Sequence, residues 1–348
     1  MTTESGNNPL TPRRHALLLA AVQEFIATAE PVGSQQLVAR HPLGVRAAMV
    51  RNLMAELEDA GYLSQPHTSA GRIPTEKAYR YYVDNLMSTQ HLGFEDRAQI
   101  ELHYSSGRRD LSEIVRDTPR LLVLLTGQAA LVMAPRLEAA MVERVNFIRL
   151  REREVLAVFV PKSGAVQNRL VDTDSDHSQA ELDRMASYLN ESLEGRTLDE
   201  ARQWIEEQLR HERAKYDHFV RDALTLGDAI AGELGRAELY VDGSLQALEQ
   251  PEFSDRGKMR DLMRALDDKS ALLELLERTI RHHGLMVSIG SENYDSRLAN
   301  LSVVATTYDS GAMPLGSLAI VGPVRMDYDR VIPLVDYTAR ALSRLLEH

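Results

Sequence analysis

Apolar positions at the start of the chain recur at intervals of three and four residues, the spacing of an amphipathic helix. This pattern predicts a helix over 12–29, with Thr11 as its N-cap and Pro12 at the first helical position. A second, shorter helix is expected to begin with Ser34 as its cap and to end before Pro42.

The same spacing predicts a third helix over 46–60. Val50, Met54 and Leu57 share its apolar face, and Gly61 follows where a C-cap glycine is expected. The apolar face of this helix therefore turns toward a small core, and its polar face toward solvent.

A two-stranded ribbon is expected next. Residues 62–65 and 72–74 have the composition of short strands, with a turn over 68–71 between them, and a helix is predicted over 75–88. Helix, turn, helix and ribbon in this order are typical of a winged helix-turn-helix, whose second motif helix enters the DNA major groove.

Beyond residue 110 the pattern changes to short apolar runs flanked by helices, which indicates an α+β sheet domain. A helix over 111–127 opens this part, a helix over 329–347 closes it, and turns are expected at 162–164 and 309–311. The predicted strands cover 145–150, 155–160, 166–171, 285–290, 301–308 and 317–324. The most apolar run, 121–135, is shorter than the roughly 20 residues that span a bilayer, so we expect a buried core element and no membrane contact.

A long helical stretch separates the two groups of strands. Capping-box patterns at Ser178 and Thr197 introduce predicted helices over 179–194 and 199–233. The stretch is interpreted as an insertion into the sheet domain, and its apolar stripe as a core or a dimer interface. Within this stripe the expected dimer contacts are Trp204, Ile205 and Leu209.

Composition narrows the possible functions. The 348 residues carry a formal net charge of -11 and no cysteine, which excludes disulfides, thiolate nucleophiles and cysteine-ligated metals. The acidic balance argues against a protein that coats nucleic acid with its whole surface, but a small DNA-binding module remains compatible. The N-terminal residues lack an apolar signal-peptide core, so a cytoplasmic location is expected.

The third predicted helix carries side chains suited to base edges. Arg46, Ala47 and Arg51 are expected to face outward, with Met49 and Asn52 at the edges of that surface. Arg and Asn make bidentate contacts with guanine and adenine, respectively. In the ribbon, Arg72 suits a narrow minor groove or a phosphate. The alternative is that these are solvated surface residues of a protein-binding module.

Several longer motifs resemble one known family, the heat-inducible transcription repressors HrcA. In the first 90 residues they are PVGS at 31–34, RN at 51–52, MAELE at 54–58, GYL at 61–63, QPHTSAGRIPT at 65–75 and YRYYVD at 79–84. Near the C-terminus they are G-x-EN at 290–293, LSVV at 301–304 and GP-x-RMDY at 322–328.

This resemblance implies a winged helix, a GAF-like domain and a dimerising insertion. It implies a dimeric repressor of chaperone operons that binds an inverted-repeat operator, CIRCE, and that depends on the GroE chaperonin to stay active. The predicted organisation is a disordered tail, a winged helix-turn-helix domain, a linker, a GAF-like domain in two pieces and an inserted dimerisation segment; these cover 1–10, 11–90, 91–110, 111–195 with 245–348, and 196–244.

The resemblance also implies which residues contact DNA. They are Ser34, Gln35, Arg46, Ala47, Met49, Arg51, Asn52, His67, Ser69, Arg72 and Lys77. The chain departs from the family pattern in this region, because Arg46, Met49 and Leu53 stand where members usually have Ser, Thr and Asp. The family assignment is therefore firmer for Arg51, Asn52 and Arg72, and an altered operator preference is expected.

Other candidate sites are weak. Residues 172–176 resemble the start of a calcium loop, but His177 and Asp183 occupy the positions of its Gly and Glu. His282 and His283 lack a third ligand at useful spacing, and no phosphate-binding or nucleophile-elbow motif is present. We therefore expect no cofactor, no metal and no enzymatic activity. A regulator gated by a small molecule bound to the GAF-like domain remains the alternative.

The charge is unevenly distributed. Residues 1–90 contain 8 Lys and Arg and 8 Asp and Glu, so the acidic excess belongs entirely to the rest of the chain. Positions 40–80 carry six of those basic residues and only four acidic ones. Such a modest positive stripe predicts few phosphate contacts per subunit, so that specific binding depends on pairing two subunits.

Overall fold

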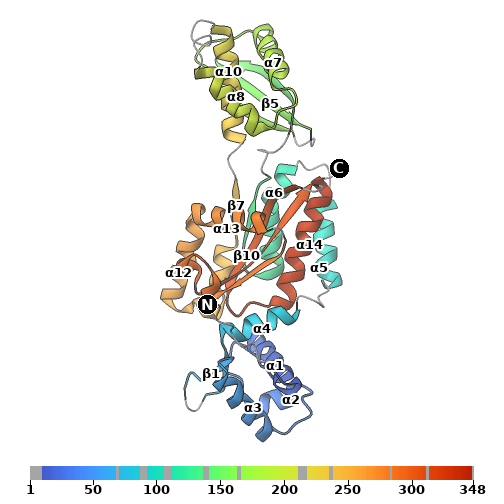
Figure 1. Ribbon diagram of the computed structural model, residues 1–348, viewed down its shortest axis with the longest axis vertical. Coiled ribbons are helices and arrows are strands. Elements are labelled where there is room, and N and C mark those ends of the chain that lie inside the picture. The colour runs from blue at the N-terminus through green and yellow to red at the C-terminus, as the bar shows by residue number, and fades with distance from the viewer. Residues whose placement is uncertain are drawn as a thin grey trace, which may run out of the picture.

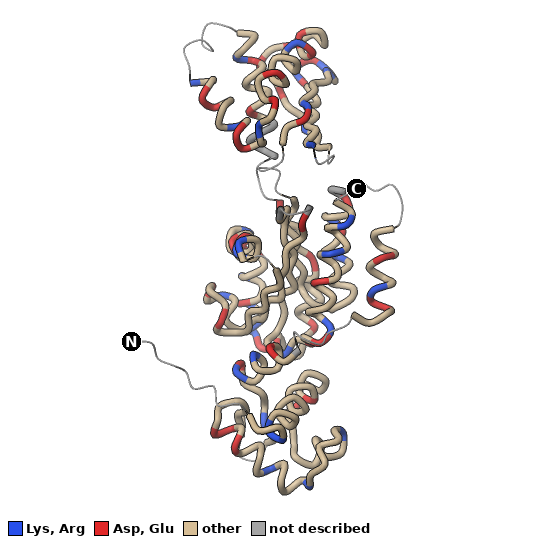
Figure 2. The backbone as a smooth tube through the Cα atoms, turned by 45° about the vertical axis from the view of Figure 1, so that its right-hand side comes forward, with Lys and Arg blue, Asp and Glu red and all other residues tan. Residues whose placement is uncertain are grey.

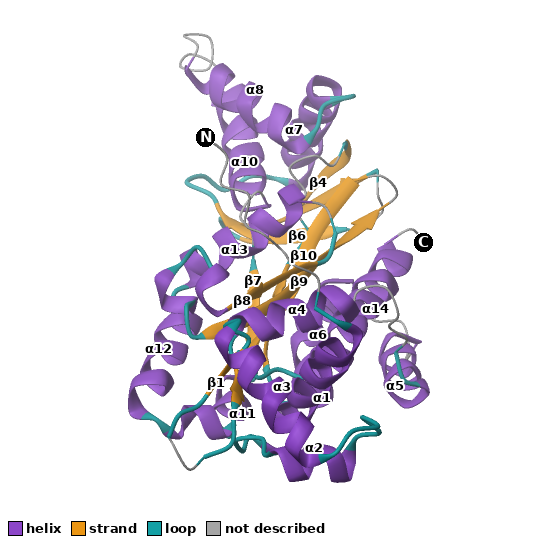
Figure 3. Cartoon of the chain, turned by 60° about the horizontal axis from the view of Figure 1, so that its bottom comes forward, coloured by secondary structure: helices purple, strands orange, loops and turns teal. Residues whose placement is uncertain are grey.

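The chain forms three units arranged along one long axis (Figure 1). The N-terminal helices lie at one end, a large sheet with helices on both faces lies in the middle, and a smaller sheet with its helices lies at the other end (Figures 1 and 3). The structure is a computed structural model that describes residues 10–67, 70–86, 92–105, 111–135, 141–162, 166–210, 218–234, 238–282, 284–310 and 313–346. This mixture of helices and sheets confirms the α+β class.

The N-terminal unit has the predicted order of elements. It consists of α1 (Pro12–Thr28), α2 (Ser34–Arg40), α3 (Ala47–Asp59), β1 (Leu63–Ser64), β2 (Ile73–Pro74) and α4 (Glu76–Leu86). The two strands are antiparallel, and Val32 adds a bridge to Arg72 with main-chain hydrogen bonds of 2.9 Å in both directions. Residues 68 and 69 of the predicted turn lie outside the described residues.

The predicted end of α3 is confirmed, but the predicted N-cap of α2 is not. Gly61 has φ +76°, and the amides of Gly61 and Tyr62 donate to the carbonyls of Glu58 and Leu57, which is a Schellman cap. Ser34 was expected to cap α2, but this was wrong. The Leu37 amide donates to the Gly33 carbonyl, so the cap position is one residue earlier.

The central sheet is entirely antiparallel, with strand order β7-β3-β10-β9-β8. The strands are β3 (Ala129–Met133), β7 (Leu239–Asp242), β8 (Met286–Ile289), β9 (Leu301–Ser310) and β10 (Met313–Pro323). β3 and β7 were not predicted as strands. All five residues of β3 are buried, so it lacks the alternation that marks a half-exposed strand, while β7 has only four residues.

Helices cover both faces of this sheet (Figure 3). Alternate strand residues divide between two cores: Val132, Val304 and Ile320 face one side, and Leu131, Val303 and Val321 face the other. The first side holds α5 (Phe94–Ser105), α6 (Leu111–Thr126) and α14 (Tyr328–Leu346). The second side holds α11 (Ser244–Leu248), η1 (Pro251–Ser254), α12 (Arg256–Asp267) and α13 (Lys269–His282).

The expected linker over 91–110 contains a helix instead, α5. Its Ile100 is fully buried, and Arg330 of α14 bonds to Asp96 through two nitrogens at 2.8 and 3.0 Å. The predicted linker was therefore wrong, because a few buried apolar residues and this ion pair attach the helix to the central unit.

The distal unit is larger than the predicted insertion. It contains β4 (Val142–Arg151), β5 (Glu154–Pro161), β6 (Gln167–Asp172), α7 (Gln179–Leu193), α8 (Leu198–Arg210) and α10 (His218–Leu234). These elements share a hydrophobic core separate from those of the central sheet. The expected boundary at 196 was therefore wrong, because the inner face of strands β4 and β5 packs against α7 rather than joining the central sheet.

One predicted helix is two helices. The pattern over 199–233 suggested a single long helix, but α8 and α10 are separate helices that pack against each other. Residues 211–217 lie outside the described part of the chain.

Both capping boxes are confirmed: the amides of Ser178 and Thr197 each donate at 2.8 Å to the glutamate three residues ahead, and that glutamate's amide donates back to the hydroxyl. Within the described ranges no helix combines the length and apolar character that a membrane crossing requires.

Candidate nucleic-acid interface

A buried carboxylate fixes α2 against α1. The Glu24 side chain is only 5% exposed, although it lies on an otherwise apolar helix face. It accepts hydrogen bonds from Gln36 and Arg40 at 2.6 Å each and lies 3.3 Å from His41. Burying a carboxylate is unfavourable unless its oxygens are bonded, so these partners determine where α2 sits.

Helix α3 presents a polar face to solvent from this frame. Val50, Met54 and Leu57 are at most 1% exposed and anchor the opposite face, as predicted. Arg46, Arg51 and Asn52 are exposed, Met49 is 46% exposed, and Ala47 is half-buried between them.

Neither Arg46 nor Arg51 forms an ion pair with another described residue, so both guanidinium groups keep their donors available. Basic positions also mark the end of this unit farthest from the central sheet (Figure 2). The exposed face of α3 therefore combines free charge with the donors and acceptors that recognise base edges.

Two further residues expected to contact DNA lie at the start of α2, a helix that packs against α3. Gln35 is exposed and Ser34 is half-buried. Of the other residues expected to contact DNA, His67 is exposed in the loop that follows β1, and Ser69 lies outside the described residues.

Arg72 has an internal role that the sequence did not reveal. Its Nε donates to Glu58 Oε2 at 2.7 Å, and its side chain is only 17% exposed. Next to it, Gly71 passes so close to the main chain of Val32 that a Cβ would lie 2.5 Å from the Val32 carbonyl oxygen. This side chain therefore ties the ribbon to the end of α3, and its contact with DNA stays a prediction.

Lys77 is also engaged within the unit. Its ammonium donates to the Ala60 carbonyl at 2.9 Å and lies 4.4 Å from the centre of the Tyr62 ring. Lysine at the C-terminus of a helix satisfies a carbonyl that has no partner within the helix. Lys77 is exposed, but in this structure it caps α3 rather than pointing away from it.

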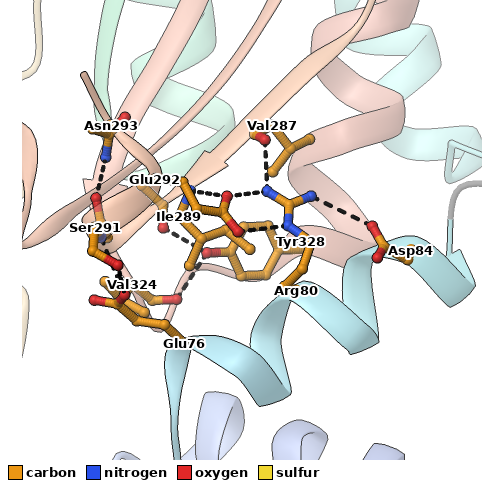
Figure 4. Close-up of polar contacts among 12 residues, drawn as sticks. Glu76, Arg80, Asp84, Val287, Ile289, Ser291, Glu292, Asn293, Val324 and Tyr328 are labelled. Carbon is orange, nitrogen blue, oxygen red and sulfur yellow. Dashed lines mark hydrogen bonds and ion pairs between the residues drawn. The ribbon is translucent and has the colours of Figure 1, made fainter. Parts of the chain in front are cut away.

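The junction between α4 and the central unit was not anticipated. Arg80 donates through Nε to Glu292 Oε1 at 2.8 Å, through Nη2 to Glu292 Oε2, and through Nη2 to the Val287 carbonyl at 2.7 Å (Figure 4). The hydrogen bond to Glu292 raises the pKa of the Arg80 guanidinium above its ordinary value. Glu76 accepts from the amide and hydroxyl of Ser291.

Other contacts make this junction continuous with the core. Tyr82 donates to Asp329 at 2.6 Å, and Arg325 donates to the Ile26 carbonyl and pairs with Glu252. Apolar residues of the N-terminal unit and of one face of the central sheet belong to the same hydrophobic cluster. The sequence showed only that the family motifs contain acidic and basic residues. It did not show which of them pair at this junction, because partners more than 200 residues apart leave no local pattern.

The expected dimer contacts do not form one free surface. Ile205 is 1% exposed and lies in the core of the distal unit, while Trp204 and Leu209 are partly buried against that core. The assignment of Ile205 to a dimer interface was wrong, because the apolar stripe on α8 faces the core of the distal unit itself.

The free apolar surface of this unit lies on the outer face of its sheet. Ile148, Leu156 and Leu170 stand opposite one another on the three strands, on the side away from the buried Phe147. Ile148, Leu150 and Leu170 are 45%, 49% and 52% exposed. We call these three residues with Leu156 the outer sheet patch.

Known proteins are similar to this one over nearly the whole chain. A family model described as the HrcA protein C terminal domain matches residues 112–332. A heat-inducible transcription repressor HrcA from Geobacter sulfurreducens is 42% identical, covering 97% of this chain and 98% of that protein. The repressor of the same name from Syntrophobacter fumaroxidans is 38% identical, covering 97% and 98%. A crystal structure of a hypothetical protein, 25% identical, superposes with a TM-score of 0.71 over 97% of this chain and 99% of that one.

Proposed function

Since the chain belongs to the HrcA family of heat-inducible transcription repressors, we propose that it represses chaperone operons by binding an inverted-repeat operator, CIRCE, as a dimer. The relatives are named as repressors of transcription, not as enzymes, so its activity is binding rather than catalysis. Binding to DNA and control by a chaperonin both require a cytoplasmic location.

The N-terminal unit is the proposed DNA-binding module, a winged helix-turn-helix. The single observation that carries this proposal is the exposed face of α3, on which Arg46, Arg51 and Asn52 remain available while the opposite face is fully buried. In this class of domain the second motif helix enters the major groove, where Arg reads guanine and Asn reads adenine. Arg72 and Lys77 support this module from within by holding the ribbon and the end of α3.

The distal unit is the proposed dimerisation unit, inserted into a GAF-like central domain. Its outer sheet patch is apolar, and none of the helices described in the unit covers it. A two-fold dimer matches a palindromic operator, and joining two modules of modest charge raises affinity through effective concentration. The occupant that suits this patch is the same patch on a second copy, because such an interface is self-complementary.

Control by the GroE chaperonin is the third part of the proposal, and the family membership supports it. In this scheme the chaperonin keeps the repressor competent to bind DNA. When unfolded proteins occupy the chaperonin, active repressor declines and the chaperone operons are expressed. The operator sequence itself is expected to differ from the family pattern in detail, because Arg46, Met49 and Leu53 alter the surface of α3.

The decisive test is a footprint on DNA upstream of a chaperonin operon from the same organism, using the full-length protein with and without chaperonin. Protection of an inverted repeat that strengthens when chaperonin is added is the expected result. Protection without any effect of chaperonin would remove only the third part of the proposal, whereas no protection under either condition would overturn its central claim.

A further inference from the structure

A cavity of about 350 Å³ lies in the central unit, between α13 and the segment that joins β8 to the 3-10 helix at Ser296–Leu298. Apolar side chains of Leu275, Met286 and Leu298 contribute to its lining, together with Arg278 and His282. Its volume falls within the range of about 300–1,000 Å³ that small-molecule sites occupy, and such sites combine an apolar lining with a few polar groups.

Arg278 is the group in this lining that can bind an acidic ligand. Of its two carboxylates, Glu274 accepts a hydrogen bond from Arg278 Nη2 at 2.7 Å, and Asp295 is paired with Arg297. Arg278 also stacks over the Tyr294 ring, 4.4 Å from its centre. A guanidinium has five N–H donors, and stacking on a ring leaves those in its plane available, so Arg278 keeps donors for a carboxylate.

One wall of the cavity is also part of the junction with the DNA-binding module. Ser288 and Asn293 line the cavity. Between and beside them, the Val287 carbonyl, Ser291 and Glu292 make the contacts with α4 (Figure 4). The same short segment therefore has a ligand-sized space on one side and Arg80 and Glu76 on the other.

This segment is held in shape by its own hydrogen bonds and by a close approach to α4. Asn293 is buried, and its Nδ2 donates to the carbonyls of Gly290, Leu298 and Leu301 at 2.7–2.9 Å. Gly290 has φ +54°, and a Cβ there would overlap the Glu76 carboxylate. A ligand that displaces the wall of the cavity thus displaces the partners of α4, since the turn has little freedom to absorb the change locally.

We propose that this cavity binds a small organic acid with an apolar body, and that its occupancy changes the DNA affinity of the N-terminal unit through the contact between α4 and residues 287–292. The binding half of this proposal depends on the cavity alone, whereas the coupling half, the effect on DNA affinity, rests on the proposed function. Because coupling is reciprocal, the ligand changes operator affinity by the same factor as operator DNA changes ligand affinity.

The binding half is tested by calorimetric titration of the full-length protein with 2-naphthoate, using the uncharged 2-naphthamide as a matched probe. The wild type is expected to bind 2-naphthoate saturably and to bind 2-naphthamide at least tenfold more weakly. The Arg278→Ala variant is expected to bind 2-naphthoate at least tenfold more weakly than the wild type does. The control Arg281→Ala removes an exposed arginine from the same helix outside the cavity lining and should leave binding unchanged. Ala271→Phe should close the space and abolish binding, with the melting temperature confirming that the variants fold.

Absence of 2-naphthoate binding, equal binding of the amide, or indifference to both cavity variants would overturn the binding half. The coupling half is tested by operator titrations with and without saturating 2-naphthoate, where a change of about fivefold or more is expected in the wild type. That change should disappear in Arg80→Ala and in Glu292→Gln. Unchanged operator affinity in the wild type would overturn the coupling. A protein that binds 2-naphthoate but no operator would instead count against the proposed function.

Discussion

Arg72 and Glu58 join the β-ribbon to the end of α3 through a hydrogen bond of 2.7 Å between Nε and Oε2. Both side chains are largely shielded, at 17% and 32% exposed, so this pair is held more firmly than a surface ion pair. The ribbon and α3 are the two elements expected to touch DNA, and this contact sets the position of one relative to the other.

Replacing Arg72 with alanine should therefore lower stability as well as DNA affinity. Loss of a charged hydrogen bond at a partly buried site is expected to reduce the free energy of unfolding by about 1–2 kcal/mol. Denaturant unfolding followed by far-UV circular dichroism measures this change, and Arg46→Ala is the control that should leave stability unchanged. If Arg72→Ala kept full stability and lost only DNA affinity, the side chain would be contacting DNA directly.

Arg51→Ala should have the opposite profile. Its guanidinium is exposed and forms no ion pair among the described residues, so stability should not change. Operator affinity should fall by about 1–3 kcal/mol if Arg51 reads a base edge. Gel shifts at fixed salt measure the loss, and Arg151→Ala, whose side chain is 81% exposed in the distal unit, controls for the removal of one positive charge. Equal affinities for Arg51→Ala and the wild type would remove Arg51 from the interface.

The sequence predicted the elements of the N-terminal unit because their signals are local. Val50, Met54 and Leu57 repeat at helical spacing, and Gly61 occupies the left-handed position that ends α3. The internal roles of Arg72 and Lys77 could not be predicted, since an arginine that binds DNA and one that binds Glu58 look identical in a sequence. What separates them is the proximity of an acceptor, and only the folded chain supplies it.

The division between central and distal units was harder to predict for a different reason. The runs that form β4–β6 and those that form β9 and β10 are all short, apolar and flanked by helices, so the sequence assigned all of them to one sheet domain. The distinction depends on which helix covers the inner residues, and Phe147 packs on α7 rather than on α14. Long-range pairing such as Arg80 with Glu292 has no local trace either.

Glu24 makes a prediction about the frame of the module. Glu24→Ala removes the acceptor that Gln36 and Arg40 share, and should reduce the free energy of unfolding by about 2 kcal/mol. The estimate is below that for a fully buried ion pair, because Arg40 is 58% exposed and returns to water when it loses its partner.

The stability of Glu24→Gln should lie between that of the wild type and that of Glu24→Ala, since an amide oxygen still accepts hydrogen bonds but carries no charge. Urea unfolding measures the series, and Glu30→Ala at the exposed end beyond α1 is the matched control. Equal stability of Glu24→Ala and Glu30→Ala would show that α2 is positioned by its apolar contacts alone.

The outer sheet patch makes the prediction with the widest consequence. Leu170→Asp places a charge in the row formed with Ile148 and Leu156, where a dimer interface would have to desolvate it. The variant should sediment as a monomer at concentrations where the wild type is a dimer. Its operator affinity should fall by about two orders of magnitude or more, because the second module no longer binds from the same molecule.

Leu245→Asp provides the matched control for this variant. Leu245 is 75% exposed on α11 of the central unit, so the same change in charge falls on a leucine outside the patch. It should leave both oligomeric state and operator affinity as they are in the wild type. A Leu170→Asp protein that remained dimeric would place the dimer interface on another surface. A monomeric Leu170→Asp protein with wild-type operator affinity would mean that one DNA-binding module suffices, and the modest charge of α3 and the ribbon would then need a different explanation.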